Sequence, residues 1–321
     1  MEYPAVRRKV ASVPAGRPIF LTGTHRSGTT WLAKMLAASG IWYVHEPFAP
    51  MKGRWPRCFD FRQSAIPDAE VDRHFSDVLA GGFRAALNLP NADHPLMPLR
   101  LLKPRFQRLL VKDPLACLLT EYLTQRFDLQ TIILFRHPAG FVASICRLGW
   151  PRAEFLKQFL LDEPLMDAHL ESHRPLIEKA SKQDDLVAAA TLCGALNLVL
   201  WRFVQQGVGK PLIFEELCSN PLDQLKALFA ELGLPYDDRV RDAHHAACFG
   251  KQQEVAEYHP HAVARNSALM ARSWTNQLSE DEIAQVRRIW DQFEVPLYQE
   301  EIDWTLVGVS PARKAVSPNH A

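Results

Sequence analysis

The chain has 321 residues, of which 47% are hydrophobic and 23% are charged, and its formal net charge is +1. This composition is ordinary for a globular protein that can bury a sizeable core. A net charge this close to zero argues against a protein that coats nucleic acid or an anionic membrane. A local group of Arg and Lys side chains could still bind an anionic ligand.

The cysteines and the apolar segments give expectations about the compartment. Six cysteines are scattered without a CxxC pair, which indicates reduced core residues and neither a metal site nor a disulfide framework. The first sixteen residues have no apolar signal-peptide core. The most apolar stretch, around Leu196 to Trp201, is interrupted by Asn197 and Arg202, so we expect no membrane span. A soluble cytoplasmic protein is the resulting prediction.

Strands and helices alternate along the chain. Short apolar runs predict strands, whereas apolar residues at helical spacing and recognisable cap residues predict helices. The expected strands are 18–22, 41–44, 108–111, 131–135 and 211–214. The expected helices are 29–38, 71–87, 115–127, one that begins at Pro138, 185–206, one framed by Pro221 and Gly233, and one opened by a capping box of Ser279 and Glu282.

This alternation is typical of a parallel sheet that is covered by helices on both faces. We predict a single α/β domain over residues 17–309, a flexible segment over 1–16 and a disordered tail over 310–321. The irregular block 54–98 and the helices between 152 and 181 match no pattern, and we expect such insertions to carry acceptor recognition.

Residues 23–30, GTHRSGTT, connect the first expected strand to its helix. Such a loop can wrap main-chain N–H groups around a phosphate at the positive end of the helix dipole. The spacing matches GxxxxGK[ST], except that Thr29 replaces the lysine that a nucleoside triphosphatase needs. Arg26 supplies a positive charge inside the loop instead, and its guanidinium can bond two oxygens of a terminal group. The alternative is a chance glycine turn with a solvated Arg26.

The segment RSGTTWL, Arg26 to Leu32, resembles the 5′-phosphosulfate-binding loop of sulfotransferases that use 3′-phosphoadenosine-5′-phosphosulfate (PAPS). The resemblance implies a P-loop-like three-layer fold, with helical insertions in this chain. It also implies that Trp31 stacks on the adenine, although a core position on the inner face of the helix is an equal alternative. The residues implied to hold the 5′-phosphate are Arg26, Ser27, Gly28, Thr29 and Thr30.

A second segment, TIILFRHPAGFVASICRL over 131–148, resembles another part of the same family. Arg136 ends a strand, and Ser144 follows eight residues later on a Pro-started helix. Open α/β sheets place ligands at the carboxyl ends of their strands, and the resemblance implies that Arg136 and Ser144 bind the 3′-phosphate. The alternative for Arg136 taken alone is a surface ion pair, and for Ser144 taken alone a solvated serine on a helix. His137 stands where many relatives have Asp, and we expect it to weaken the helix cap.

Two further strand ends carry candidates for the chemistry. Glu46, in VHEP, resembles the glutamate of carbohydrate and tyrosylprotein sulfotransferases, which implies a general base. Lys112, in VKDP, resembles the lysine that assists the leaving group. The alternatives are a solvated carboxylate for Glu46 and an ion pair with Asp113 for Lys112. His45 is the reserve base.

The patterns of the cytosolic aryl and steroid sulfotransferases are not intact in this chain. Lys103-Pro104 is not followed by a histidine, and the C-terminal Arg-Lys-Gly loop is missing. Arg265, Ser267 and Arg272 are weak candidates for a shortened version of that loop.

These residues together predict a metal-independent sulfotransferase that moves a sulfuryl group from PAPS to a hydroxyl acceptor, with 3′,5′-adenosine bisphosphate as product. The glutamate base mildly favours a carbohydrate or lipid acceptor, and no nucleic acid partner is expected. One alternative is a P-loop kinase of small molecules, which the missing lysine disfavours. Another is a non-catalytic protein that binds the bisphosphate. The sequence gives no indication of oligomeric state.

Overall fold

A five-stranded parallel sheet lies at the centre of the computed structural model, which describes residues 16–49, 58–62, 66–80, 108–249 and 267–305. The strand order is β2-β3-β1-β4-β5, so β1 is central and the segment that follows it lies in the middle of the carboxyl edge. The strands are β1 (Ile19–Gly23), β2 (Trp42–His45), β3 (Leu109–Lys112), β4 (Gln130–Phe135) and β5 (Lys210–Ile213). All five expected strands are confirmed, with small shifts at their ends.

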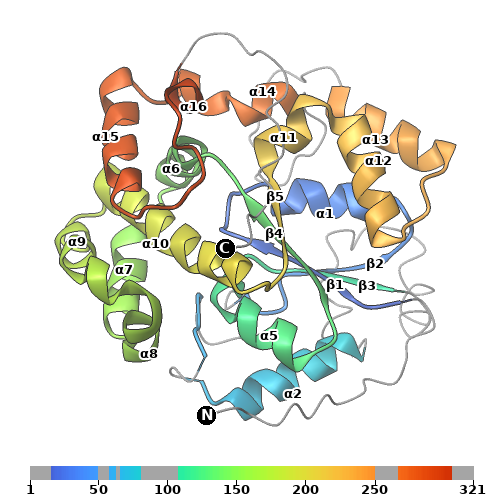
Figure 1. Ribbon diagram of the computed structural model, residues 1–321, viewed down its shortest axis with the longest axis horizontal. Coiled ribbons are helices and arrows are strands. Elements are labelled where there is room, and N and C mark those ends of the chain that lie inside the picture. The colour runs from blue at the N-terminus through green and yellow to red at the C-terminus, as the bar shows by residue number, and fades with distance from the viewer. Residues whose placement is uncertain (1–15, 50–57, 63–65, 81–107, 250–266, 306–321) are drawn as a thin grey trace.

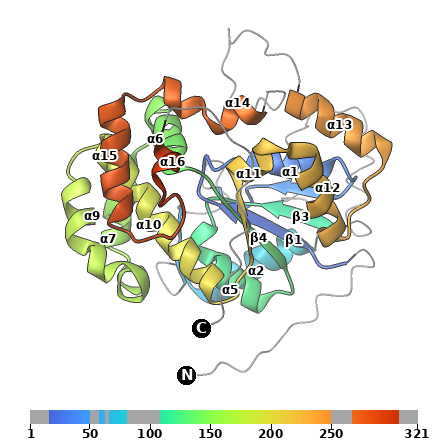
Figure 2. The ribbon, with the colours of Figure 1, turned by 45° about the horizontal axis from the view of Figure 1, so that its top comes forward.

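Helices cover both faces of the sheet (Figures 1 and 2). One face carries α1 (Thr29–Ala37), α11 (Phe214–Ser219), α12 (Pro221–Leu232) and α13 (Asp238–Phe249). The other face carries α2 (Asp68–Leu79), α5 (Thr120–Arg126), α6 (Pro138–Arg147) and α10 (Leu186–Gln205). The predicted α/β three-layer fold is therefore confirmed.

Alternation along the strands assigns side chains to these two faces. Leu21 of β1 and Leu110 of β3 belong to the core cluster on the α1 face, whereas Phe20 and Val111 belong to the cluster on the α2 face. Such alternation places every second side chain on the same face of a sheet. Lys112 continues the series of Leu110, so its side chain leaves the end of β3 on the α1 face.

The remaining helices form a group beside the sheet, shown on the left of Figure 1 around α10. The insertion between residues 152 and 180 folds against α10 and belongs to the same core cluster. The helices of this group are α7 (Arg152–Leu160), α8 (Glu163–Leu165), a π-helical turn (Met166–Leu170), a 3₁₀ turn (Glu171–His173), α9 (Arg174–Ala180), α15 (Glu280–Asp291) and α16 (Glu301–Trp304). Helix α14 (Ser267–Ala271) and a 3₁₀ turn (Ser273–Asn276) lead into α15.

We expected no segment that is long and apolar enough to span a membrane, but α10 is such a segment by length and composition. Its 20 residues have a mean hydropathy of 1.7 over the best window, but 78% of that window is buried inside the protein. The Asn197 side chain is buried as well, and its amide donates to the Cys193 carbonyl oxygen at 2.7 Å. A helix that is apolar on all sides and buried by its own protein is a core helix.

Helix ends follow the predicted signals in most places. The Ser279–Glu282 capping box is present, and Gly233 ends α12 with a φ of 66°. The helix expected over 115–127 instead begins as a 3₁₀ turn (Cys117–Leu119) before α5. The predicted flexible N-terminal segment and C-terminal tail, and the part of the predicted helix 71–87 beyond residue 80, lie outside the described residues. Four of the six cysteines are buried, and Cys58 and Cys146 are partly buried.

Candidate active site

The loop between β1 and α1 has a backbone that two glycines make possible. Gly23 and Gly28 have φ values of 146° and 98°, in the region that favours glycine. A Cβ on Gly23 would lie 2.2 Å from the Leu134 carbonyl oxygen, and one on Gly28 would lie 2.5 Å from the Phe214 ring. Arg26 also has a positive φ, 70°. The loop is therefore held close to β4 and α11, at the N-terminus of α1.

Ser27 has a buried hydroxyl that no residue of the described structure satisfies. Its side chain is fully buried, and its hydroxyl oxygen has no hydrogen-bond partner in the described structure. Leaving a buried polar group unsatisfied costs about 1–3 kcal/mol. An oxygen-rich ligand seated in the loop would accept from this hydroxyl and remove that cost.

The two predicted phosphate segments meet at this loop. The Arg26 Nε donates to the Ser144 hydroxyl oxygen at 2.9 Å, although the two residues are 118 positions apart in sequence. The Arg136 Nη1 donates to the Arg26 carbonyl oxygen at 2.8 Å, and its Nη2 donates to the Met270 carbonyl oxygen at 3.1 Å. Two guanidinium groups and a serine hydroxyl thus converge at the carboxyl ends of β1 and β4.

Arg136 is oriented by the start of α11. Its guanidinium lies over the Phe214 ring, 5.0 Å from the centroid. The neighbouring Glu215 accepts from the main-chain N–H of His137 at 3.1 Å and from the Tyr298 hydroxyl at 2.7 Å. Burial raises the pKa of Glu215, and the charge of Arg136 opposes that shift. This support could not be predicted from the sequence, because it comes from residues far away along the chain.

His137 does not weaken the cap of α6, which corrects the expectation from the sequence. Its Nδ1 accepts from the Ala139 main-chain N–H at 3.2 Å, so the imidazole takes the place of an Asp carboxylate as N-cap. The ring stacks on Trp274, with centroids 4.6 Å apart and planes 3° from parallel. Burial lowers the pKa of His137 to about 3, which keeps the ring neutral and able to accept.

Trp31 lies in the core on the sheet side of α1. Its ring is 4% exposed and meets the Phe214 ring edge to face at 5.7 Å. Of the two alternatives for this residue, the packing favours the core position, and little of the ring is available for an adenine in this conformation.

Glu46 and Lys112 form an ion pair at the ends of β2 and β3. The Lys112 ammonium contacts the Glu46 Oε1, and the lysine side chain is 1% exposed whereas the glutamate side chain is 21% exposed. The backbone brings them together, because the Glu46 main-chain N–H donates to the Lys112 carbonyl oxygen at 2.8 Å. The partner of Lys112 is thus Glu46, and not Asp113 as one interpretation of the sequence had it.

Asp113 instead organises the chain around this pair. Its carboxylate oxygens accept from the main-chain N–H groups of Phe48 (2.7 Å), Leu115 (2.9 Å) and Ala116 (3.2 Å). These bonds fix the segment after β2 to the segment after β3. Burial, together with the nearby charge of Glu46, raises the pKa of Asp113 to about 7.

The His25 side chain packs the loop between β1 and α1 against a group of aromatic rings. The imidazole is buried among the rings of Phe59, Phe141, Trp150 and Phe155, and it stacks on Trp150 with centroids 4.7 Å apart. Burial lowers the pKa of His25 to about 3, with the charge of Arg26 acting in the same direction. A ring held neutral and buried in this way has a structural role in the loop and is poorly suited to act as a base.

The weak candidates near the C-terminus are only partly described. Lys103 and Arg265 lie outside the described residues, and Ser267 is buried at the start of α14. Arg272 follows α14. The contribution of this segment that the structure does show is the Met270 carbonyl, which accepts from Arg136.

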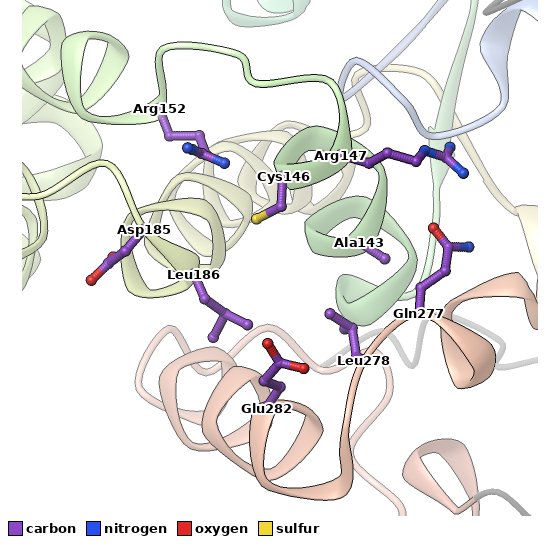
Figure 3. A pocket seen from close by; sticks show the side chains of 9 residues that line it. All are labelled: Ala143, Cys146, Arg147, Arg152, Asp185, Leu186, Gln277, Leu278 and Glu282. Carbon is purple, nitrogen blue, oxygen red and sulfur yellow. The ribbon is translucent and has the colours of Figure 1, made fainter. Parts of the chain in front are cut away.

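A separate cavity of about 500 Å³ lies between α6, α10 and the start of α15 (Figure 3). None of the predicted site residues lines it. Its charged side chains already have structural partners: Arg152 pairs with Asp184, Asp185 caps α10, and Glu282 completes the capping box of α15. We assign no ligand to this cavity.

Comparison with known proteins identifies the family. A sequence profile described as the sulfotransferase family matches residues 18–238. Structural comparison matches the sulfotransferase domain from the curacin biosynthetic pathway (19% identity, 88% of this chain, 99% of that chain, TM-score 0.48). It also matches the sulfotransferase domain of the Synechococcus PCC 7002 olefin synthase (18%, 88%, 96%, 0.42) and the sulfotransferase STF9 from Mycobacterium avium (14%, 88%, 78%, 0.40).

No curated protein sequence matches the chain. The profile match nevertheless covers more than half of the residues, and it includes the phosphate loop, Glu46, Lys112, Arg136 and Ser144. The chain therefore belongs to the sulfotransferase family, and it is a sulfotransferase.

Proposed function

We propose that this enzyme takes its sulfuryl group from PAPS and transfers it to a hydroxyl group of a carbohydrate or lipid. The observation that carries the proposal is the hydrogen bond between Arg26 and Ser144, at 2.9 Å. It joins the segment expected to bind the 5′-phosphosulfate to the segment expected to bind the 3′-phosphate. A donor with phosphates at both ends of one ribose needs two such groups side by side.

The 5′ end of the donor fits the loop between β1 and α1. The unsatisfied Ser27 hydroxyl, the positive end of the α1 dipole and the Arg26 guanidinium all favour an anion there. The residues in this cradle are Arg26, Ser27, Gly28, Thr29 and Thr30. Arg136 and Ser144, from the end of β4 and from α6, would bind the 3′-phosphate.

Glu46 is the proposed general base. It accepts the proton of the acceptor hydroxyl, while the hydroxyl oxygen forms a bond to sulfur. The bond between sulfur and the oxygen that bridges to the 5′-phosphate breaks, and its electron pair leaves on that oxygen. Lys112 and Arg26 stabilise the charge that develops there, as preorganised cations do in buried sites.

The proposed acceptor is a sugar or lipid hydroxyl that reaches Glu46. The Glu-Pro segment at the end of β2 resembles that of carbohydrate sulfotransferases, which supports a sugar or lipid hydroxyl over a phenol. The side chain of Glu46 is 21% exposed, which supports access for an external hydroxyl.

Calorimetric titration with 3′,5′-adenosine bisphosphate tests the donor site, with 5′-AMP and ATP as controls and without added metal. We expect tight binding of the bisphosphate and weak binding of 5′-AMP, because the 3′-phosphate contacts are lost. Preference for ATP would contradict the proposed donor and support phosphoryl transfer instead.

A panel of acceptors tests the second half of the proposal. PAPS would be supplied with simple sugars, hydroxylated lipids and phenols, and bisphosphate formation would be followed together with the sulfated product. Turnover with a sugar or lipid supports the proposed acceptor class. Turnover with phenols alone would contradict it while leaving PAPS as the donor.

A further inference from the structure

Two side chains of β2 precede the proposed base. Tyr43 and His45 are two residues apart on a strand, so they lie on the same face of the sheet, the face that carries α1. His45 lies opposite Lys112 in the register between β2 and β3. Tyr43, His45 and Glu46 thus follow one another along β2 and just beyond it, and Lys112 lies at the end of the neighbouring strand β3.

The Tyr43 hydroxyl and the His45 Nδ1 form a hydrogen bond whose direction depends on the tautomer of the imidazole. The Tyr43 hydroxyl lies 2.7 Å from the His45 Nδ1. Burial raises the pKa of Tyr43, and the charges of Glu46 and Asp113 act in the same direction, so the phenol keeps its proton. A phenol that donates to Nδ1 leaves the proton of the neutral ring on Nε2.

The Nε2 of His45 faces the oxygen of Glu46 that Lys112 does not contact. It lies 3.7 Å from the Glu46 Oε2, whereas the Lys112 ammonium contacts Oε1. At 3.7 Å this separation is longer than a hydrogen bond. Hydrogen bonds of catalytic groups are often long before the substrate binds, and they shorten in the complex.

The backbone of Glu46 shows that this residue must be held in place. Its φ is 45°, in the left-handed region, which costs a residue with a side chain about 1–3 kcal/mol unless its surroundings enforce it. Its main-chain N–H donates to the Lys112 carbonyl, and its own carbonyl accepts from Ala49 at 3.1 Å. These contacts fix the backbone, while the carboxylate is oriented by Lys112 and His45.

We propose that Tyr43 and His45 are positioning residues for the Glu46 carboxylate, and that His45 is not itself the base. Tyr43 occupies Nδ1 and the proton occupies Nε2, so the neutral ring has no lone pair to offer to an acceptor hydroxyl. The inference rests on the proposed function of Glu46. When the Lys112 ammonium turns toward the leaving oxygen, the Nε2–H of His45 keeps Oε2 in place and leaves Oε1 to take the proton.

Substitutions of His45 separate a positioning role from a base. A glutamine at position 45 keeps an N–H donor at about the place of Nε2 but cannot act as a base, whereas alanine removes both functions. We expect His45→Ala to lower kcat about 10- to 100-fold with little change in the KM for PAPS, as misplacement of a catalytic group does. His45→Gln recovers most of that loss, and His245→Gln, on the exposed side of α13, is the matched control.

The same variants give the contrary result if His45 is the base. In that case His45→Gln and His45→Ala would both lower kcat by about 10²- to 10⁴-fold, which would overturn the proposal.

A spectroscopic measurement tests the tautomer without any acceptor. The ¹⁵N chemical shifts of the imidazole distinguish a proton on Nε2 from one on Nδ1, and the His45→Gln spectrum assigns the resonance. We expect Nε2–H in the wild type and a mixture of tautomers in Tyr43→Phe. A proton on Nδ1 in the wild type would overturn the proposal.

Binding of the bisphosphate distinguishes a failure of the proposed function from a failure of the positioning role of His45. A wild-type protein that neither binds 3′,5′-adenosine bisphosphate nor turns over PAPS would overturn the proposed function, and the role of His45 with it. A wild-type protein that does both, combined with a glutamine variant as slow as the alanine variant, would overturn the positioning role alone.

Discussion

Two groups of charged residues at the same edge of the sheet use their charges differently. At the ends of β1 and β4, Arg26 and Arg136 donate to a serine hydroxyl and to main-chain carbonyls. At the ends of β2 and β3, the Lys112 ammonium faces the Glu46 carboxylate. The hydrogen bonds just named for the first group, which we call the binding group, go to neutral oxygens, although the buried Glu215 lies close enough to Arg136 for their charges to interact. In the second group, which we call the reactive group, opposite charges contact each other directly.

In the proposed mechanism the two groups have different tasks: the binding group holds the donor, and the reactive group carries out the transfer. A guanidinium oriented by neutral partners can exchange a partner for a phosphate without leaving a buried carboxylate alone. A lysine paired with a glutamate can stabilise a leaving group only when it turns away from that glutamate, and the glutamate becomes a stronger base at the same moment. The two groups should therefore respond differently to substitution: the binding group through donor affinity, and the reactive group through turnover.

The largest expected effect is that of Arg26→Ala, because the proposed mechanism assigns Arg26 to both donor binding and chemistry. We expect kcat/KM for PAPS to fall by about 10³-fold or more, since a charged hydrogen bond to the donor and an electrostatic contribution to the transition state are both lost. Residue 26 already has a φ of 70°, so alanine adds no new kind of backbone strain. The measurement is bisphosphate release from PAPS, with Arg241→Ala on the exposed face of α13 as the charge-matched control. Normal turnover in a folded variant would contradict the mechanism.

Glu46→Gln should affect the reactive group alone. Removing a general base lowers kcat by about 10²- to 10⁴-fold, and we expect the affinity for 3′,5′-adenosine bisphosphate to change by no more than about twofold. Steady-state kinetics and calorimetry on the same preparation check this pair of results. If bisphosphate affinity falls as much as kcat does, the division between the two groups is wrong.

Arg136→Ala should show the reverse pattern: donor affinity should fall, and turnover should change little. Loss of a charged hydrogen bond to the 3′-phosphate is expected to raise the dissociation constant of the bisphosphate about 10- to 100-fold, while 5′-AMP affinity stays nearly constant. Turnover at saturating PAPS should change far less than in Glu46→Gln. Equal losses of affinity for both nucleotides would show that Arg136 does not recognise the 3′-phosphate.

The last comparison concerns stability, and not activity, and it involves the carboxyl group next to the reactive group. The folded-state pKa of Asp113 is raised to about 7, so between about pH 4 and pH 7 the folded protein holds a proton that the unfolded chain releases. The contribution of Asp113 to the free energy of unfolding is therefore largest at low pH and is lost as the pH rises through this window, by up to about 1.4 kcal/mol per pH unit.

Comparison with Asp113→Asn isolates this contribution from that of the buried histidines. Urea unfolding of both proteins at several pH values should show the stability of the wild type falling relative to that of the variant as pH rises. Parallel curves across the window would mean that Asp113 is already ionised at low pH in the folded protein.

The strands and the phosphate loop could be predicted from the sequence because their signals are local. Short apolar runs located all five strands, and the spacing of Gly23, Arg26 and Gly28 located the loop before the structure placed it at the central strand. The capping box at Ser279 is also a local pattern, and it is present.

The partners of several site residues could not be predicted, because they depend on distant segments. That Lys112 pairs with Glu46 and that Asp113 bonds to Phe48 both require β2 and β3 to be neighbours, which the order of elements along the chain does not specify. His137 keeps the helix cap because aromatic residues from the C-terminal part bury it and keep it neutral. The contact between Tyr43 and His45 was predictable in principle, because side chains two residues apart on a strand lie on the same face of the sheet.

Helix α10 has a consequence for how the chain can be divided. The matched family profile ends at residue 238, but the Phe293 ring packs so closely on Gly194 that a Cβ there would lie 2.1 Å from it. A fragment that stopped at the end of the profile would lack α15 and Phe293, and it would expose to water the apolar side of α10 that they cover. An exposed apolar surface of this kind favours aggregation, so we expect a stable fragment of this enzyme to extend beyond the matched profile and to include α15.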